Sequence, residues 1–294
     1  MAGEDSELAR EIGIGAILGA PFTLATLAMF VVGASALAYR KRRGQGSKIR
    51  CQEANAGQDF PWCRATGRDP IIDEKTIARD MLFFLVFFTV AAASGLLELP
   101  FTAKVGVAVL LTVVYADYVR RTLHSSDALE EVPERLTVWR FQSRPPLFAV
   151  LAQALFALGL MVVGAQIFVH GVEGAAEGAG LPASLISLVL APLATELPEK
   201  VNSVLWIRDD KDTLALGNVT GAMLFQSTIP VTLGILFTSW DLGPLNLFSV
   251  ALALVSGGII YVVLRSRATL QPWHLMIGGF FYLLFLVGAI FTLT

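Results

Sequence analysis

Eight apolar segments, each long enough to cross a lipid bilayer, follow one another along this chain of 294 residues. A membrane helix needs about 20 mostly apolar residues, and only structures whose backbone groups bond to one another can cross lipid. The composition agrees, because 55% of the residues are hydrophobic and only 16% are charged. We therefore predict an all-α polytopic membrane protein. Its expected transmembrane segments are residues 12–39, 78–97, 103–119, 147–171, 181–207, 213–240, 245–264 and 273–294.

Lysine and arginine gather in every second loop between these segments. The loops after the first, third, fifth and seventh segments carry nearly all of them, whereas the opposite loops hold little more than Lys104. Cytoplasmic loops carry such an excess, so both chain ends are predicted to lie on the outer side. The acidic start MAGEDSELARE lacks the basic region of a signal peptide, so we expect the first helix to be retained. The expected location is the plasma (inner) membrane, crossed several times.

Charge and histidine placement exclude two classes of function. The net charge is −2, and the basic residues flank helix ends without forming a face interleaved with aromatic rings, so no nucleic-acid partner is expected. His124, His170 and His274 are scattered, and the sequence has no HExxH motif. We therefore expect a protein that is not an enzyme and that has the lipid bilayer as its surroundings.

An internal repeat links the two halves of the chain. A shift of 206 residues aligns 8–27 with 214–233 and gives seven identities in twenty positions. The two copies lie five crossings apart, so they must run in opposite directions, as in the inverted repeats of transporters. The predicted organisation is a first membrane region at 1–121 with a cytoplasmic loop at 40–77, a cytoplasmic linker at 122–145, and a second membrane region at 146–294.

The motif LATELPEK places acidic residues inside the predicted fifth helix. Thr195, Glu196 and Glu199 lie at helical spacing on one face, and two nearby prolines free backbone carbonyls. An acid at mid-bilayer costs about 3 kcal/mol by insertion scales, so such residues usually serve transport. Their oxygens suit Na⁺ or Ca²⁺, and mutual repulsion favours a cation or a proton between them. Alternatively, the acids lie near the cytoplasmic end of the helix, wetted or paired with Lys200.

Polar residues also interrupt the next segment, 213–240. Asn218 and Gln226 are predicted to face the acidic motif and to contribute to an ion path. For both, hydrogen bonding between helices without any role in transport is the alternative. Gly217 and Gly221 are expected to permit close helix approach.

The stretch LISLVLAPLATELPE followed by LALGNVTGAMLFQ resembles the sodium/calcium exchanger family of the calcium/cation antiporter superfamily. That family has ten helices in two inverted halves, and the eight segments look like its third to tenth. The resemblance implies that Thr195 and Glu199 match the family's threonine and cation-binding glutamate, and that Asn218 belongs to its framework. Glu196 stands where the family has serine, and Gln226 stands where it has asparagine or aspartate.

This resemblance implies a secondary-active antiporter that exchanges Ca²⁺ for Na⁺ or H⁺ by alternating access. It implies no cofactor, with inorganic cations as the transported partners. The predicted ion ligands are Glu199, Glu196, Thr195, Asn218 and Gln226. Because the family's first acidic helix has no counterpart here, we expect two further helices before this chain and an incomplete first repeat. The alternative function is a non-transporting, degenerate exchanger half that acts as a membrane partner or scaffold.

Overall fold

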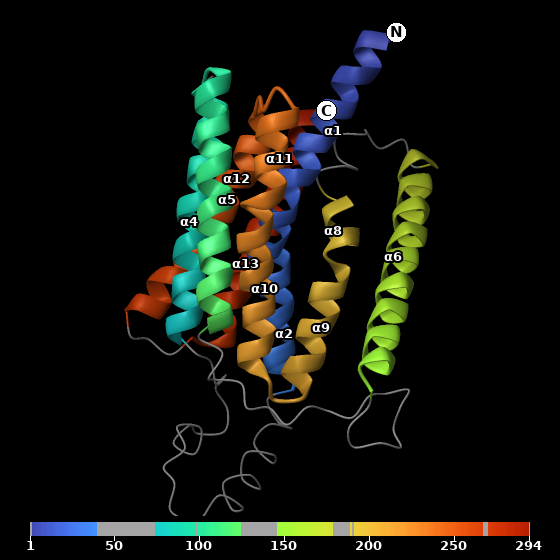
Figure 1. Cartoon of the computed structure of the whole chain (residues 1–294), viewed down its shortest axis with the longest axis vertical. Coiled ribbons are helices and arrows are strands. Elements are labelled where there is room, and N and C mark those ends of the chain that lie inside the picture. The colour runs from blue at the N-terminus through green and yellow to red at the C-terminus, as the bar shows by residue number, and fades with distance from the viewer. Residues whose placement is uncertain are drawn as a thin grey trace, which may run out of the picture.

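Every regular element in the computed structural model is a helix within the residues described, which are 2–39, 74–97, 99–124, 146–178, 189, 191–266 and 270–293 (Figure 1). This confirms the predicted all-α class. The helices are α1 (Ala2–Thr23), the π-helix η1 (Leu24–Ala28), α2 (Met29–Ala38), α4 (Glu74–Leu96), α5 (Phe101–His124), α6 (Leu147–Gly178), α8 (Ala191–Thr195), α9 (Leu197–Arg208), α10 (Asp212–Gln226), α11 (Ile229–Phe237), α12 (Pro244–Arg265) and α13 (Pro272–Leu293).

Seven segments of the described residues are long and apolar enough to span a membrane. They cover seven of the eight predicted segments. The exception is 181–207, whose described part is divided into α8 and α9 rather than forming one continuous helix. The predicted loop 40–77 and linker 122–145 lie largely outside the described residues. Helix α5 runs past its predicted end at 119 to His124, and Arg121 there pairs with Asp117 one turn earlier at 2.7 Å.

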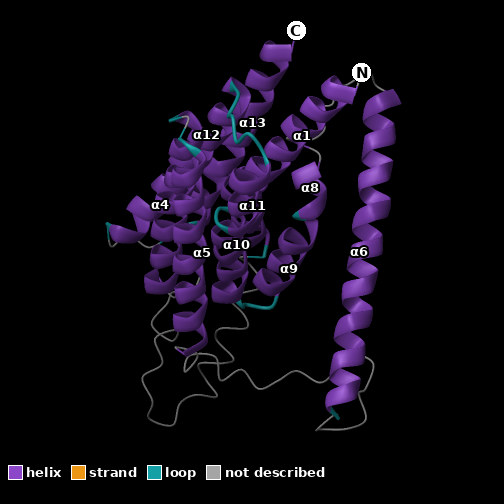
Figure 2. Cartoon of the chain, turned by 45° about the horizontal axis from the view of Figure 1, so that its top comes forward, coloured by secondary structure: helices purple, strands orange, loops and turns teal. Residues whose placement is uncertain are grey.

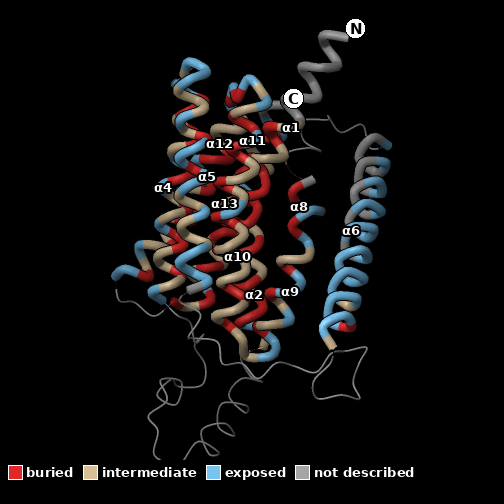
Figure 3. Tube along the Cα trace, in the orientation of Figure 1, coloured by how far each residue is buried: buried red, intermediate tan, exposed pale blue. Residues whose placement is uncertain are grey.

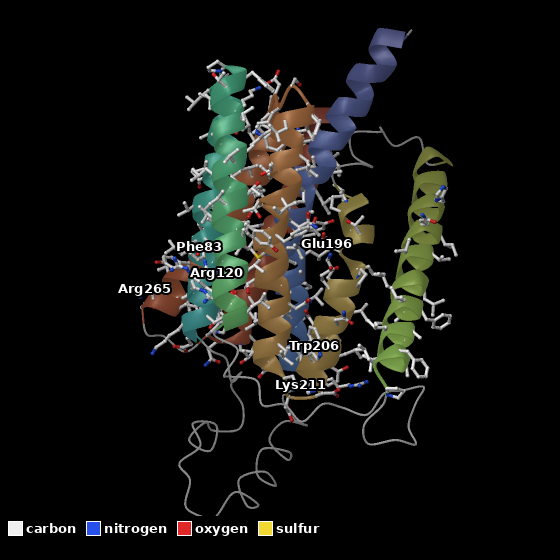
Figure 4. All side chains as sticks on the ribbon, viewed as in Figure 1. Phe83, Arg120, Glu196, Trp206, Lys211 and Arg265 are labelled. Atoms are coloured by element: carbon white, nitrogen blue, oxygen red, sulfur yellow. The ribbon has the colours of Figure 1, made fainter. Side chains whose placement is uncertain are left out.

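The beginning of α1 and the end of α13 lie at the same end of the bundle, as Figures 1 and 2 show. This agrees with the prediction that both termini are on one side of the membrane. Arg120, Lys211 and Arg265 lie toward the opposite end (Figure 4). The arrangement therefore has the separation of basic residues that the loop composition predicted.

The inverted repeat is visible in the paths of two interrupted helices. The segment α1–η1–α2 runs away from the N-terminal end of the bundle, whereas α10–α11 runs toward it (Figure 1). In the first copy, η1 follows Pro21, which has no backbone N–H to donate. In the second copy, the helix is interrupted at Ser227 and Thr228, and the repeat spacing aligns Ser227 with Pro21 (227 − 206 = 21). Both copies are thus irregular in the same region, although η1 begins three residues after the position aligned with Ser227 (24 − 21 = 3).

The core lies between the central helices, whereas α6 lies at the edge beside α8, with mostly exposed described side chains (Figure 3). Helix α13 packs against α2 and η1, and α12 packs against α4. The α13–η1 contact is close because Gly278 lies directly against the main chain of Thr26. A methyl group at Gly278 would overlap the carbonyl oxygen of Thr26, so glycine is required for this packing.

We expect Gly278→Ala to lower the free energy of unfolding by about 1–3 kcal/mol, because the backbone of η1 must shift to admit the methyl group. Thermal unfolding in detergent measures the loss. Gly258→Ala is the matched control, because a methyl group at that helix position meets no atom within 4 Å. Equal stability of the two variants would contradict close packing at Gly278.

Candidate functional site

A helix break at Glu196 positions the acidic motif. Helix α8 ends at Thr195, α9 begins at Leu197, and Glu196 between them has φ −90° and ψ 7°. Pro198 provides the local reason, because it cannot donate the backbone hydrogen bond that would continue α8 into α9. Glu196 lies about midway along the bundle (Figure 4). The acid is therefore deep within the helical bundle rather than near the cytoplasmic end.

The side chains of Glu196 and Gln226 meet across this break. Glu196 is only 2% exposed, and its Oε1 accepts a hydrogen bond of 2.9 Å from Nε2 of Gln226. Its second oxygen, Oε2, is buried and has no hydrogen-bond partner, and the same is true of Oε2 of Glu199. Buried carboxylate oxygens are costly unless they are paired or coordinate a metal. Two such oxygens lie three residues apart in the sequence, and the roles of Glu196, Glu199 and Gln226 as ion ligands stay predictions.

Asn218 joins α10 to α9. Its Nδ2 donates to the main-chain oxygen of Glu199 at 3.1 Å and to Oγ of Ser203 at 3.3 Å. The Ser203 hydroxyl in turn donates to the main-chain oxygen of Ala215 at 3.1 Å. These contacts favour the interhelical role that was the alternative for Asn218. Its role as an ion ligand stays a prediction.

Thr195 and two glycines are placed differently from expectation. Thr195 is exposed, and its hydroxyl donates to the main-chain oxygen of Pro192 within its own helix at 3.3 Å. Its ligand role also stays a prediction. The expected close helix approach at Gly217 and Gly221 is wrong, because a methyl group at either position would meet no atom within 4 Å. These glycines border open space on α10.

Lys200 is buried beside the acidic pair, with 5% of its surface exposed. Its Nζ donates to the main-chain oxygen of Glu196 at 3.1 Å, and its charge interacts with the carboxylates of both Glu196 and Glu199. The sequence alternative paired the acids with Lys200. The hydrogen bond instead joins the ammonium group to the backbone at the helix break.

A second buried carboxylate, Asp80 on α4, has a role that the sequence analysis missed. Its Oδ1 accepts hydrogen bonds from the Tyr118 hydroxyl at 3.0 Å and from Nη2 of Arg79 at 3.2 Å. Its Oδ2 accepts one from the Thr220 hydroxyl at 3.1 Å. The guanidinium group of Arg79 also lies over the Tyr118 ring. The signal in the sequence is the single acid in RDMLFFLVFF, and the network joins α4, α5 and α10.

Within the described residues, no group of three or more His, Cys, Asp or Glu side chains is placed to hold a metal ion. A cation at the helix break would therefore combine the two glutamates with amide, hydroxyl or main-chain oxygens. Na⁺ and Ca²⁺ accept such mixed oxygen ligands.

Comparisons with known proteins point to one family. The family model described as sodium/calcium exchanger protein matches residues 149–294. The sodium/calcium exchanger MaX1 of Methanosarcina acetivorans is 29% identical over 141 residues, which are 46% of this chain and 40% of that protein. The inner membrane protein YrbG of Escherichia coli is 27% identical over 128 residues, 42% of this chain and 39% of that protein. The matches thus span about four tenths of these relatives' lengths.

Two solved exchangers have a similar fold. The sodium-calcium exchanger NCX_Mj superposes with a TM-score of 0.64 at 20% identity, covering 95% of this chain and 77% of that chain. The H⁺/Ca²⁺ exchanger CAX superposes with a TM-score of 0.55 at 15% identity, covering 96% of this chain and 71% of that chain. The likeness extends over nearly the whole chain, including the part before residue 149.

We expect Asp80→Ala to destabilise the bundle by about 2–4 kcal/mol, because it removes the buried acceptor that the Tyr118 and Thr220 hydroxyls share and leaves Arg79 without its ion-pair partner. Unfolding in detergent measures the change. Asp117→Ala on α5 is the control, because its exposed ion pair with Arg121 contributes less than about 1 kcal/mol. A loss at Asp80 no larger than at Asp117 would contradict a stabilising role for the buried network.

Proposed function

The chain belongs to the sodium/calcium exchanger family, and from this membership and the site at the helix break we propose that it is a secondary-active cation antiporter. It exchanges Ca²⁺ for Na⁺ or H⁺ across the membrane by alternating access. The observation that carries the proposal is the pair of buried, unpartnered oxygens on Glu196 and Glu199 midway along a membrane bundle.

The ligand chemistry supports Ca²⁺ as the transported ion. Ca²⁺ takes about six to eight oxygen ligands and favours carboxylates together with carbonyl and amide oxygens. Glu196 and Glu199 supply the charged ligands, and Gln226 lies directly against Glu196. Thr195 and Asn218 complete the proposed set. The two carboxylates together balance the charge of one divalent cation.

The same acidic pair supports coupling between the two ions. When Ca²⁺ leaves, two adjacent buried carboxylates repel each other and remain poorly solvated. Na⁺ ions or protons relieve this cost. If the site is stable only with an ion bound, its access changes from one side of the membrane to the other only in the ion-bound state. Transport of one ion is then coupled to transport of the other.

Interrupted helices supply points at which the site can change its access. The break between α8 and α9 lies at Glu196, and the break between α10 and α11 directly follows Gln226. In membrane proteins, irregular backbone at such depth is tolerated where it lies within protein or lines a water-filled cavity. Small rearrangements at these two breaks would open the pair to one side or the other.

Uptake of radioactive Ca²⁺ into vesicles containing the purified chain tests the proposal. We expect Ca²⁺ to accumulate against its gradient when an opposing gradient of Na⁺ or of H⁺ is imposed, and the effective gradient identifies the coupling ion. A folded protein that moves no cation under any gradient would support the scaffold alternative and refute exchange.

We expect Glu196→Gln and Glu199→Gln each to lower the initial rate of Ca²⁺ uptake at subsaturating Ca²⁺ by about tenfold or more, because each removes one charged ligand. The control is Glu74→Gln, which changes an exposed acid at the start of α4 and should leave uptake unchanged. If both site variants took up Ca²⁺ at the rate of the control, the acidic pair would not be required for transport.

A further inference from the structure

Lys200 is a buried cation in a place where the proposed function requires a binding site for cations. It lies one turn after Glu196 and directly after Glu199, with only 5% of its surface exposed. Its Nζ bonds to the main chain of Glu196 itself, which places the ammonium group beside the acidic motif. A buried ammonium group is costly in a membrane bundle, so a lysine at this position beside two acids indicates a functional role.

The hydrogen bond of Lys200 holds it near the acids without consuming their ligand atoms. Nζ donates to the main-chain oxygen of Glu196 at 3.1 Å. Meanwhile Oε1 of Glu196 is bonded to Gln226, and Oε2 of both glutamates is without a partner. The positive charge is thus anchored to the backbone, while carboxylate oxygens stay available to an incoming ion.

The local charge balance follows from these three residues. Two ionised carboxylates carry −2, and the ammonium group brings the sum to −1 (−2 + 1 = −1). Coulomb repulsion between Lys200 and an incoming cation doubles when the cation is divalent. The buried lysine therefore weakens binding of a divalent ion more than that of a monovalent ion.

We propose that Lys200 is a specificity-determining residue, a tethered counter-charge that lowers the preference of the Glu196–Glu199 site for divalent over monovalent cations. The inference rests on the proposed function in using that site for the transported ions. Its consequence is a site from which Ca²⁺ is displaced readily by Na⁺, because the fixed positive charge prevents the carboxylates from holding a divalent ion too tightly.

Cation binding to the purified full chain, measured by isothermal titration calorimetry with Ca²⁺ and with Na⁺, tests this. Lys200→Gln removes the charge but keeps a donor for the main-chain oxygen of Glu196, and we expect it to raise the ratio of Ca²⁺ to Na⁺ affinity by about tenfold. Lys200→Arg keeps the charge and should retain the wild-type ratio. Lys104→Gln, which removes a positive charge from a half-buried position at the start of α5, should also retain it.

A double variant separates charge from shape. Lys200→Gln combined with Glu196→Gln returns the local charge to −1, so the affinity ratio should move back toward the wild-type value. Gel filtration establishes that each variant is folded, and Lys200→Met replaces Lys200→Gln if the latter does not fold. Two results would refute the role of Lys200 as a counter-charge: an unchanged ratio of Ca²⁺ to Na⁺ affinity in the charge-removing variant, or the same change of that ratio in Lys200→Arg.

Transport and binding measurements together distinguish the counter-charge role of Lys200 from cation exchange by the protein. If the wild type exchanges Ca²⁺ in vesicles but the ratio is insensitive to Lys200, the counter-charge is refuted and exchange stands. If the wild type transports nothing while Lys200→Gln binds Ca²⁺ more tightly relative to Na⁺, the counter-charge stands and exchange is refuted. Absence of binding by both proteins would refute both.

Discussion

Lipid offers no hydrogen-bond partner to a polypeptide backbone, so the helix breaks in the described part of this protein need hydrogen-bond partners from the protein itself. At the α8–α9 break, the main chain of Glu196 stays bonded: its N–H donates to the main-chain oxygen of Pro192 at 3.0 Å, and its oxygen accepts from the backbone N–H of Lys200 at 3.3 Å and from Nζ of Lys200 at 3.1 Å. At the α10–α11 break, the hydroxyls of Ser227 and Thr228 donate to the main-chain oxygen of Leu224 at 3.0 and 2.8 Å. The breaks are therefore stabilised features, and they bring side chains together that a continuous helix would separate.

The buried acids divide into two kinds by how their oxygens are bonded. Asp80 has partners on both oxygens from α4, α5 and α10, so its charge is used to hold helices together. Glu196 and Glu199 each keep a buried oxygen without a partner. The bonded carboxylate joins helices, whereas the open oxygens of Glu196 and Glu199 are the reason the ligand role is proposed for that pair.

Local patterns in the sequence predicted the helices better than their interruptions. The long apolar segments predicted seven spans, because hydropathy and length alone decide which segments lipid accepts. The division of 181–207 at Glu196 was not predicted, although the prolines that cause it were evident. Gly217 and Gly221 were expected at a close helix contact, which the structure instead has at Gly278 and Thr26. Spacing identifies small residues but does not show which of them faces a neighbour.

The sequence by itself determined the membrane class, the antiparallel repeat and the presence of Glu196 and Glu199 within one apolar segment, because all of these depend on composition and order along the chain. Only the tertiary structure decided the partners of the polar groups. Gln226 was predicted to face the acidic motif, but its bond to Glu196 across 30 positions, like the bond of Thr220 to Asp80 across 140 positions, depends on how the helices pack. Helical periodicity relates residues within a few turns, whereas contacts at such separations arise from the packing of whole helices.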